Sequence, residues 1–173
     1  ILMTEHYTPK FQEEYSAKLP AMALLLNLGW TFLSPEQALV SRNGKADTVV
    51  LQDILRNELK KRRFVFAGKQ YPLSEQSIDN LIYEICSPAL NEGLQTANER
   101  IYNHLMYGIA VTEFIDGKKN HPTIPIIDWD NPANNSFVFT EEYNVTRSGG
   151  VDSRRPDIVC FVNGIPLVVI EAK

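Results

Sequence analysis

Three residues near the end of the 173-residue chain have side chains suited to chemistry on a phosphate: Asp157, Glu171 and Lys173. The acids flank two apolar segments joined by an Asn-Gly pair. Carboxylate oxygens bind hard cations such as Mg²⁺, which polarise a phosphodiester and lower the pKa of bound water. The lysine, two residues past the second acid, projects from the same strand face and can orient the attacking water or offset transition-state charge. The pattern predicts a metal-dependent nuclease site; the alternative is a surface hairpin with ordinary charged ends.

The loop of this hairpin decides whether the site forms, because side chains alternate between strand faces and a slip of one residue inverts them. A regular two-residue type I′ turn, the default for Asn-Gly, would place Asp157 opposite Ile170 and turn it away from Glu171. A three-residue loop, with Gly164 left-handed in a G1 bulge, places Asp157 opposite Val169, so that both acids and the lysine share one face. We predict this three-residue loop, or a bulge of equal effect.

The same region resembles the amino-terminal nuclease domain of the restriction (R, HsdR) subunit of type I restriction endonucleases, within the PD-(D/E)xK nuclease superfamily. The resemblance is specific over residues 154–159 (RRPDIV), 161–171 (FVNGIPLVVIE) and Lys173. It extends upstream, less specifically, to residues 134–137 (NNSF), 142–145 (EYNV) and 28–30 (LGW).

This resemblance implies that Asp157 and Glu171 hold Mg²⁺ and that Lys173 is the catalytic lysine of a domain that cleaves double-stranded DNA. It also implies an acid from the first helix, for which Glu13 and Glu14 are the candidates; the alternative for both is an exposed helix face. The implied partners are the remainder of the R subunit and the modification and specificity subunits of the restriction complex, which would recognise the DNA sequence.

Residues 1–173 are expected to form one N-terminal nuclease domain, a fragment of a larger multidomain subunit whose ATP-driven translocase this chain lacks. ATP is therefore not an expected ligand here, and the isolated fragment is expected to be weakly active or inactive. The alternative function is a non-catalytic docking module that keeps the nuclease fold and joins the motor to the methyltransferase core.

Length and composition favour a single domain, because 173 residues with 44% hydrophobic content can build one core. Cys86 and Cys160 lie among apolar residues and are expected to be buried, reduced thiols. No signal peptide or membrane-spanning run is recognisable. We therefore expect a cytoplasmic protein without membrane association.

The net charge of −4 is unfavourable for DNA binding, which rests on Lys and Arg neutralising phosphates, so the placement of the basic residues matters. Arg154 and Arg155 lie beside the proposed metal-binding strand and are predicted to contact DNA. The alternative for this pair is an ion pair with Glu141 or Glu142 on the neighbouring strand. The basic segment 60–63 either contacts DNA or complements the end of a helix.

These residues must be positioned by helices followed by strands. Hydrophobic periodicity and capping signals predict helices over 8–29 (with an interruption at Pro20), 47–63, 74–87 and 94–106. Predicted strands are a hairpin of 108–115 with 121–128 around Asp116-Gly117, a strand over 137–145, and the two strands of the site. The uninterrupted apolar run 165–170 is expected to be a central strand buried on both faces. The expected fold class is α/β (α+β), a mixed β-sheet flanked by helices that the resemblance makes restriction-endonuclease-like.

Overall fold

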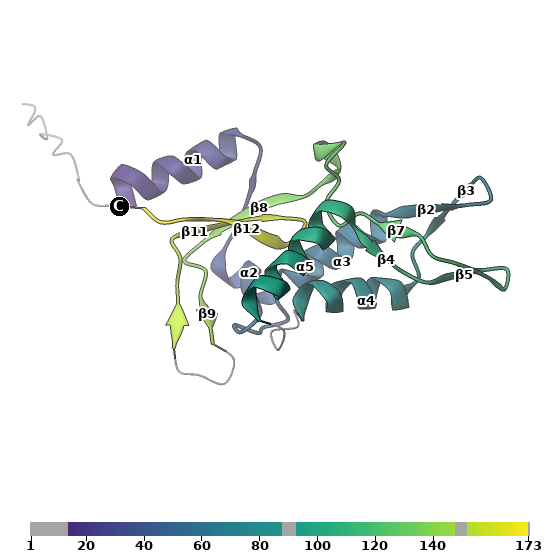
Figure 1. Cartoon of the computed structure of the whole chain (residues 1–173). Helices are drawn as coiled ribbons and strands as arrows, with labels where there is room; N and C mark the ends of the chain where they lie inside the picture. The colour runs from purple at the N-terminus through teal and green to yellow at the C-terminus, as the bar shows by residue number, and fades with distance from the viewer. Residues whose placement is uncertain (1–13, 88–92, 148–151, 173) are drawn as a thin grey trace, which may run out of the picture.

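The computed structural model describes residues 14–87, 93–147 and 152–172 (Figure 1). Its helical elements are η1 (Glu14–Lys18, a π-helical turn), α1 (Leu19–Asn27), α2 (Pro35–Val40), α3 (Gln52–Lys61), α4 (Glu75–Cys86), α5 (Leu94–Tyr107) and η3 (Pro132–Asn134, a 3₁₀ turn). Its strands are β1 (Thr31–Leu33), β2 (Arg63–Phe66), β3 (Lys69–Pro72), β4 (Ile109–Ala110), β5 (Glu113–Ile115), β6 (Lys118–Asn120), β7 (Thr123–Ile124), β8 (Phe137–Glu141), β9 (Val145–Thr146), β10 (Ser153–Arg154), β11 (Ile158–Val162) and β12 (Ile165–Ile170).

A four-stranded mixed sheet in the order β1-β8-β11-β12 organises the domain. The β1 strand is parallel to β8, whereas β11 is antiparallel to both of its neighbours, β8 and β12. One face is covered by α1, whose Leu25 packs on Phe139, Ile158 and Cys160. The other face is covered by α2 and the start of α3, with Ala38 among the residues that pack there. The expected restriction-endonuclease-like α/β fold is confirmed.

A separate core joins α3 and α4 to the short hairpins beside them (Figure 1). The apolar stripe of α3 contributes Leu55 and Leu59, and that of α4 contributes Ile78, Leu81 and Ile82. All five side chains are buried, and each contributes about 1.5–3 kcal/mol relative to an exposed position. This core anchors α3, which also contacts the turn of the site.

The helices follow local signals with two corrections. The third predicted helix is confirmed as α4, whose N-cap Ser74 accepts a hydrogen bond from the backbone of Ser77. The second begins at Gln52 and not at the predicted Asp47, because the backbone N–H of Leu51 instead donates to Gly164 O at 2.8 Å. The α2 helix was not predicted, although its capping box, Ser34 with Gln37, is visible in the sequence.

The amino-terminal helical prediction is confirmed over the part that the structure describes. Helical structure changes from π to α at Leu19, just before Pro20, and ends before Gly29, whose φ of +88° is left-handed. The predicted start at Thr8 lies outside the described residues. The α5 helix confirms the fourth predicted helix.

The hairpin predicted around Asp116-Gly117 is present in two pieces, β5 with β6 next to the turn and β4 with β7 further out. The β2–β3 hairpin, which turns at Ala67-Gly68, was not predicted. Neither hairpin joins the four-stranded sheet that carries the β11–β12 hairpin, so neither contributes a strand to the proposed metal site.

The expectation that 165–170 is a central strand is wrong, because β12 is the last strand of the sheet. Leu167, Val168 and Val169 are 41%, 48% and 56% exposed, and within the described ranges no strand pairs with the outer edge of β12. An apolar run reveals strand propensity but not which side of a sheet receives a neighbour.

Both cysteines are free; Cys160 is buried, as predicted, whereas Cys86 is only partly buried. Burial raises the pKa of both thiols, which favours the inert protonated form. None of the described helices combines the length and apolar character needed to cross a bilayer.

Candidate metal and DNA site

The turn between β11 and β12 differs from the predicted loop, but a bulge in β12 shifts the register by one residue. Asn163 and Gly164 have φ of 52° and 81° and form a two-residue turn that pairs Val162 with Ile165, so the three-residue loop was wrong. The register then shifts: Phe161 pairs with Pro166 but Cys160 pairs with Val168. The residue left over, Leu167, is a β-bulge, which confirms the alternative that was predicted with the loop.

The bulge determines which way the acids face. Beyond it, Ile158 pairs with Ile170, the last pair of the two strands, and Asp157 and Glu171 are the next residues along the chain on either side. Directly opposed residues in an antiparallel pair project from the same face with Cβ atoms about 4.5–5.5 Å apart. Asp157 Oδ2 also accepts a hydrogen bond of 2.8 Å from the backbone N–H of Ala172. Asp157 is half-buried and Glu171 exposed, so a ligand can reach both.

Strand alternation assigns Asp157 to the face of the sheet covered by α2 and the start of α3, because Asp157 is in alternation with Val159 and Phe161. Those two residues pack with Ala38 of α2 and Leu51 on that face. The α1 helix covers the opposite face. Of the remaining candidates, Lys173 and Glu13 lie outside the described residues, and Glu14 is the first residue of η1.

A cluster of ion pairs secures the backbone beside Asp157. The ammonium of Lys18, a buried residue, lies 2.8 Å from Glu141 Oε2 and 2.6 Å from Glu142 Oε1. The other oxygen of Glu142 accepts from Arg155 Nε at 2.6 Å. The backbone N–H of Glu142, a residue with φ of 50°, donates to Asp157 O at 3.0 Å. The cluster thus ties η1 to the end of β8 and to the acid on the next strand.

Lys18 is a site-supporting residue that the sequence did not reveal. Burial alone would lower its pKa, but hydrogen bonds and charge from Glu141 and Glu142 outweigh burial, so the pKa of Lys18 lies above its ordinary value. Lys18 and these acids are separated by more than a hundred residues in the sequence, and the only signal was a pair of acids at the end of a predicted strand.

A second support comes from a buried arginine on the α2 side. Arg42 is 3% exposed, donates through Nη1 to Thr48 O and Asn144 O, and lies 4.3 Å from the centroid of the Tyr143 ring. Tyr143 donates its hydroxyl to Val49 O, and its backbone N–H donates to Pro156 O. Burial raises the pKa of Tyr143 to about 12. These contacts hold the segment before Asp157 against the loop after α2.

Arg154 and Arg155 have different environments. Arg155 forms the ion pair with Glu142 that was the alternative to DNA contact. Arg154 is exposed, and over the described ranges it makes no ion pair. The prediction that both arginines contact DNA stays a prediction, and Arg154 is the more available of the two.

The donor set can be compared with the needs of a metal ion. Nowhere in the described part of the chain do three or more His, Cys, Asp or Glu side chains gather in a way that could hold an ion. At the proposed site, the described residues include two carboxylates, Asp157 and Glu171. That set fits Mg²⁺, which commonly uses one or two carboxylates and completes its shell with waters and substrate oxygens.

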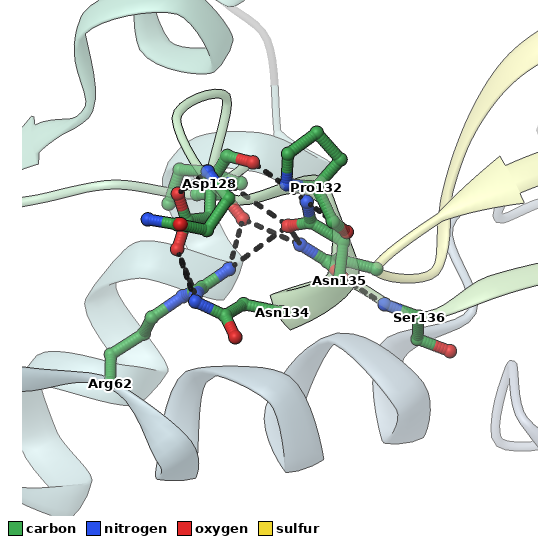
Figure 2. Close-up of polar contacts among 9 residues, drawn as sticks. Arg62, Asp128, Pro132, Asn134, Asn135 and Ser136 are labelled. Carbon is green, nitrogen blue, oxygen red and sulfur yellow. Dashed lines mark hydrogen bonds and ion pairs between the residues drawn. The ribbon is translucent and has the colours of Figure 1, made fainter.

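A polar hollow of about 580 Å³ lies at the opposite end of the sheet, near the Asn163 turn. Its charged side chains are paired with each other or with neighbours: Lys61 with Glu58, and Arg62 with Asp128. Figure 2 shows Arg62, Asp128 and Asn134 joined in one hydrogen-bonded network with Asn135. Two residues of the basic segment 60–63, Lys61 and Arg62, are thus engaged in ion pairs within the domain, and contact of this segment with DNA stays a prediction.

Comparisons with known proteins agree with the resemblance. A family model described as type I restriction enzyme R protein N terminus matches residues 10–173. The chain is 25% identical over 168 residues, 95% of its length, to a putative type I restriction enzyme MjaIXP endonuclease subunit of Methanocaldococcus jannaschii. It is 29% identical over 154 residues, 86% of its length, to the type I restriction enzyme HindI endonuclease subunit of Haemophilus influenzae. It spans only 15% and 14% of the lengths of these relatives.

Proposed function

Because the chain belongs to the family of type I restriction enzyme R protein N termini, we propose that it is the endonuclease domain of such a subunit and hydrolyses double-stranded DNA with Mg²⁺. The observation that supports this proposal is the bulged register, which pairs Ile158 with Ile170, the residues next to Asp157 and Glu171. The relatives are named as endonuclease subunits, which supports a nuclease role.

Asp157 and Glu171 would hold the metal ion, which when bound supplies Lewis acidity and lowers the pKa of its water. The hydrogen bond from Ala172 N fixes one oxygen of Asp157 and leaves the other available. Lys173, two residues after Glu171 in the sequence, would orient the attacking water or stabilise charge on the phosphate. Glu14, and Glu13 before it, stay candidates for a further acid.

The test is DNA cleavage by the complete R subunit assembled with its partners. Asp157→Asn, Glu171→Gln and Lys173→Ala are each expected to lower Mg²⁺-dependent cleavage by about 10²-fold or more, while ATP hydrolysis is unchanged. Asp116→Asn, a matched change in the remote β5–β6 turn, is expected to cleave normally. Normal cleavage by any one of the three would remove that residue from the site, and normal cleavage by all three would refute the nuclease proposal.

A second candidate function is favoured by the exposed apolar edge of β12. It is a non-catalytic docking module that contacts other parts of the restriction complex through this edge. The two functions differ in metal binding, since a docking module has no need of a cation between Asp157 and Glu171.

A further inference from the structure

A narrow antiparallel ribbon, β9 with β10, leaves the four-stranded sheet immediately before Asp157. It pairs Thr146 with Ser153 and Val145 with Arg154, and the hydrogen bond from Arg147 N to Asp152 O (3.0 Å) extends it by one step. Figure 1 shows the ribbon extending away from the sheet on the side opposite to α1. That is the side to which the register assigns the carboxylates of Asp157 and Glu171.

Two arginines share one face of this ribbon. Arg154 is opposite Val145, and Arg147, two residues further along the same strand, projects from the same face as Val145. Both side chains are exposed, and in the described ranges neither forms an ion pair. Asp152 lies across from Arg147 on that face, so the face carries a net positive charge. These residues also line a hollow of about 680 Å³.

The ribbon lies within reach of DNA placed at the two acids. Arg154 is three residues before Asp157, a span of about 10 Å at most, which equals roughly three base pairs of duplex rise. A guanidinium group can bind two phosphate oxygens in a bidentate geometry. A chain with a net charge of −4 also needs a local basic surface to approach a polyanion.

We propose that Arg147 and Arg154, on one face of the β9–β10 ribbon, bind phosphates of the DNA backbone beside the scissile phosphate. These contacts would not depend on the DNA sequence. This inference rests on the proposed function, because it takes the duplex to lie at Asp157 and Glu171. It assigns the DNA contact to Arg154 and Arg147, and leaves Arg155 in its ion pair with Glu142.

The experiment measures binding of the protein to a short DNA duplex in EDTA, where cleavage does not interfere, over a series of salt concentrations. Each lost phosphate contact is expected to reduce the slope of log K against log[salt] by about 0.9, so Arg147→Ala/Arg154→Ala should reduce it by about 1.8. The control, Lys118→Ala/Lys119→Ala, makes the same charge change on exposed positions of the remote β5–β6 hairpin and should keep the wild-type slope. Asp152→Asn should tighten binding.

An unchanged slope in the arginine variant would overturn the inference, as would equal losses in the two double variants, since net charge alone would then explain the effect. Absence of salt-dependent binding by the wild-type protein would overturn it as well. None of these results decides the role of Asp157, which the cleavage experiment tests separately. All four substituted basic residues are exposed, so the melting temperatures of both double variants should match that of the wild-type protein. A lowered melting temperature would reveal a folding defect.

Discussion

Asp157 is held by hydrogen bonds that use its backbone oxygen and only one oxygen of its carboxylate. Its backbone oxygen accepts from Glu142 N and its Oδ2 accepts from Ala172 N, so the side chain is fixed between β8 and β12. These contacts would keep the Asp157 carboxylate correctly oriented as a metal ligand, because small displacements of catalytic groups reduce reaction rates strongly. Lys18, through Glu142, is the most remote member of this arrangement.

The ion pairs of Lys18 predict a specific pH dependence of stability. Since the pKa of Lys18 is raised in the folded state, its contribution is fully present below the unfolded lysine pKa of about 10.4 and is lost as pH rises through the folded value. We expect Lys18→Met to destabilise the protein by about 2 kcal/mol at neutral pH, less than a fully buried pair would lose. The partner carboxylates are 30% and 32% exposed, which reduces the loss.

The measurement is urea unfolding of wild-type and Lys18→Met protein at about pH 8 and about pH 11. The difference in unfolding free energy between the two proteins should shrink at the higher pH. A difference that stays constant across this range would mean that Lys18 stabilises the fold through its methylene groups alone and not through its charge.

At the scale of elements, the β11–β12 turn is the part on which the site depends. Gly164 is left-handed and packs against the start of α3, where an added Cβ would lie 2.5 Å from Leu51 O and 3.0 Å from Leu55 N. The turn therefore fixes one end of the bulged hairpin against a helix that is itself anchored in the α3–α4 core.

A matched pair of glycine substitutions tests this. Gly164→Ala and Gly117→Ala both place alanine in a left-handed conformation, which costs about 1–2 kcal/mol, but a Cβ at Gly117 meets nothing within 4 Å. Gly164→Ala is expected to lose about 2 kcal/mol more, because backbone must move to relieve the contact. Thermal unfolding measures both, and equal losses would show that the turn does not depend on its contact with α3.

The sequence predicted the hairpin, its two acids and the need for an irregular register, because strand alternation and the positions of Asp157 and Glu171 were fixed by the chain itself. It did not predict where the irregularity lies. Asn163-Gly164 satisfies a two-residue turn locally, and the extra residue is absorbed at Leu167. The position of the bulge depends on how β11 pairs with β8 and how the turn packs against α3. Neither contact can be predicted from a local sequence pattern.

Long-range partners were the other limit of prediction. The pairing of Lys18 with Glu141 and Glu142 and the edge position of β12 follow from the topology of the whole sheet. The cap of α2, in contrast, was visible as Ser34 followed three residues later by Gln37, and could have been predicted from the sequence alone.

At the scale of the whole molecule, the two ends of the sheet differ in character. At the Asn163 end, Asn135 accepts hydrogen bonds from Arg62 (Figure 2) and from Asn163. At the Asp157 end, the acids lie beside a basic ribbon and an exposed strand edge. We attribute structural roles to the first end and DNA chemistry to the second, and this division is what the nuclease proposal requires of the domain.

The most direct test of the nuclease proposal is calorimetric titration of Mn²⁺ into the protein together with a hydrolysis-resistant DNA duplex. Wild-type protein and Asp116→Ala should bind the ion far more tightly with DNA than without it, because substrate oxygens complete the coordination shell. Asp157→Ala should lose this DNA-coupled binding. Equal heats from wild-type protein and Asp157→Ala would contradict the assignment of a metal to Asp157 and Glu171 and would favour the docking module.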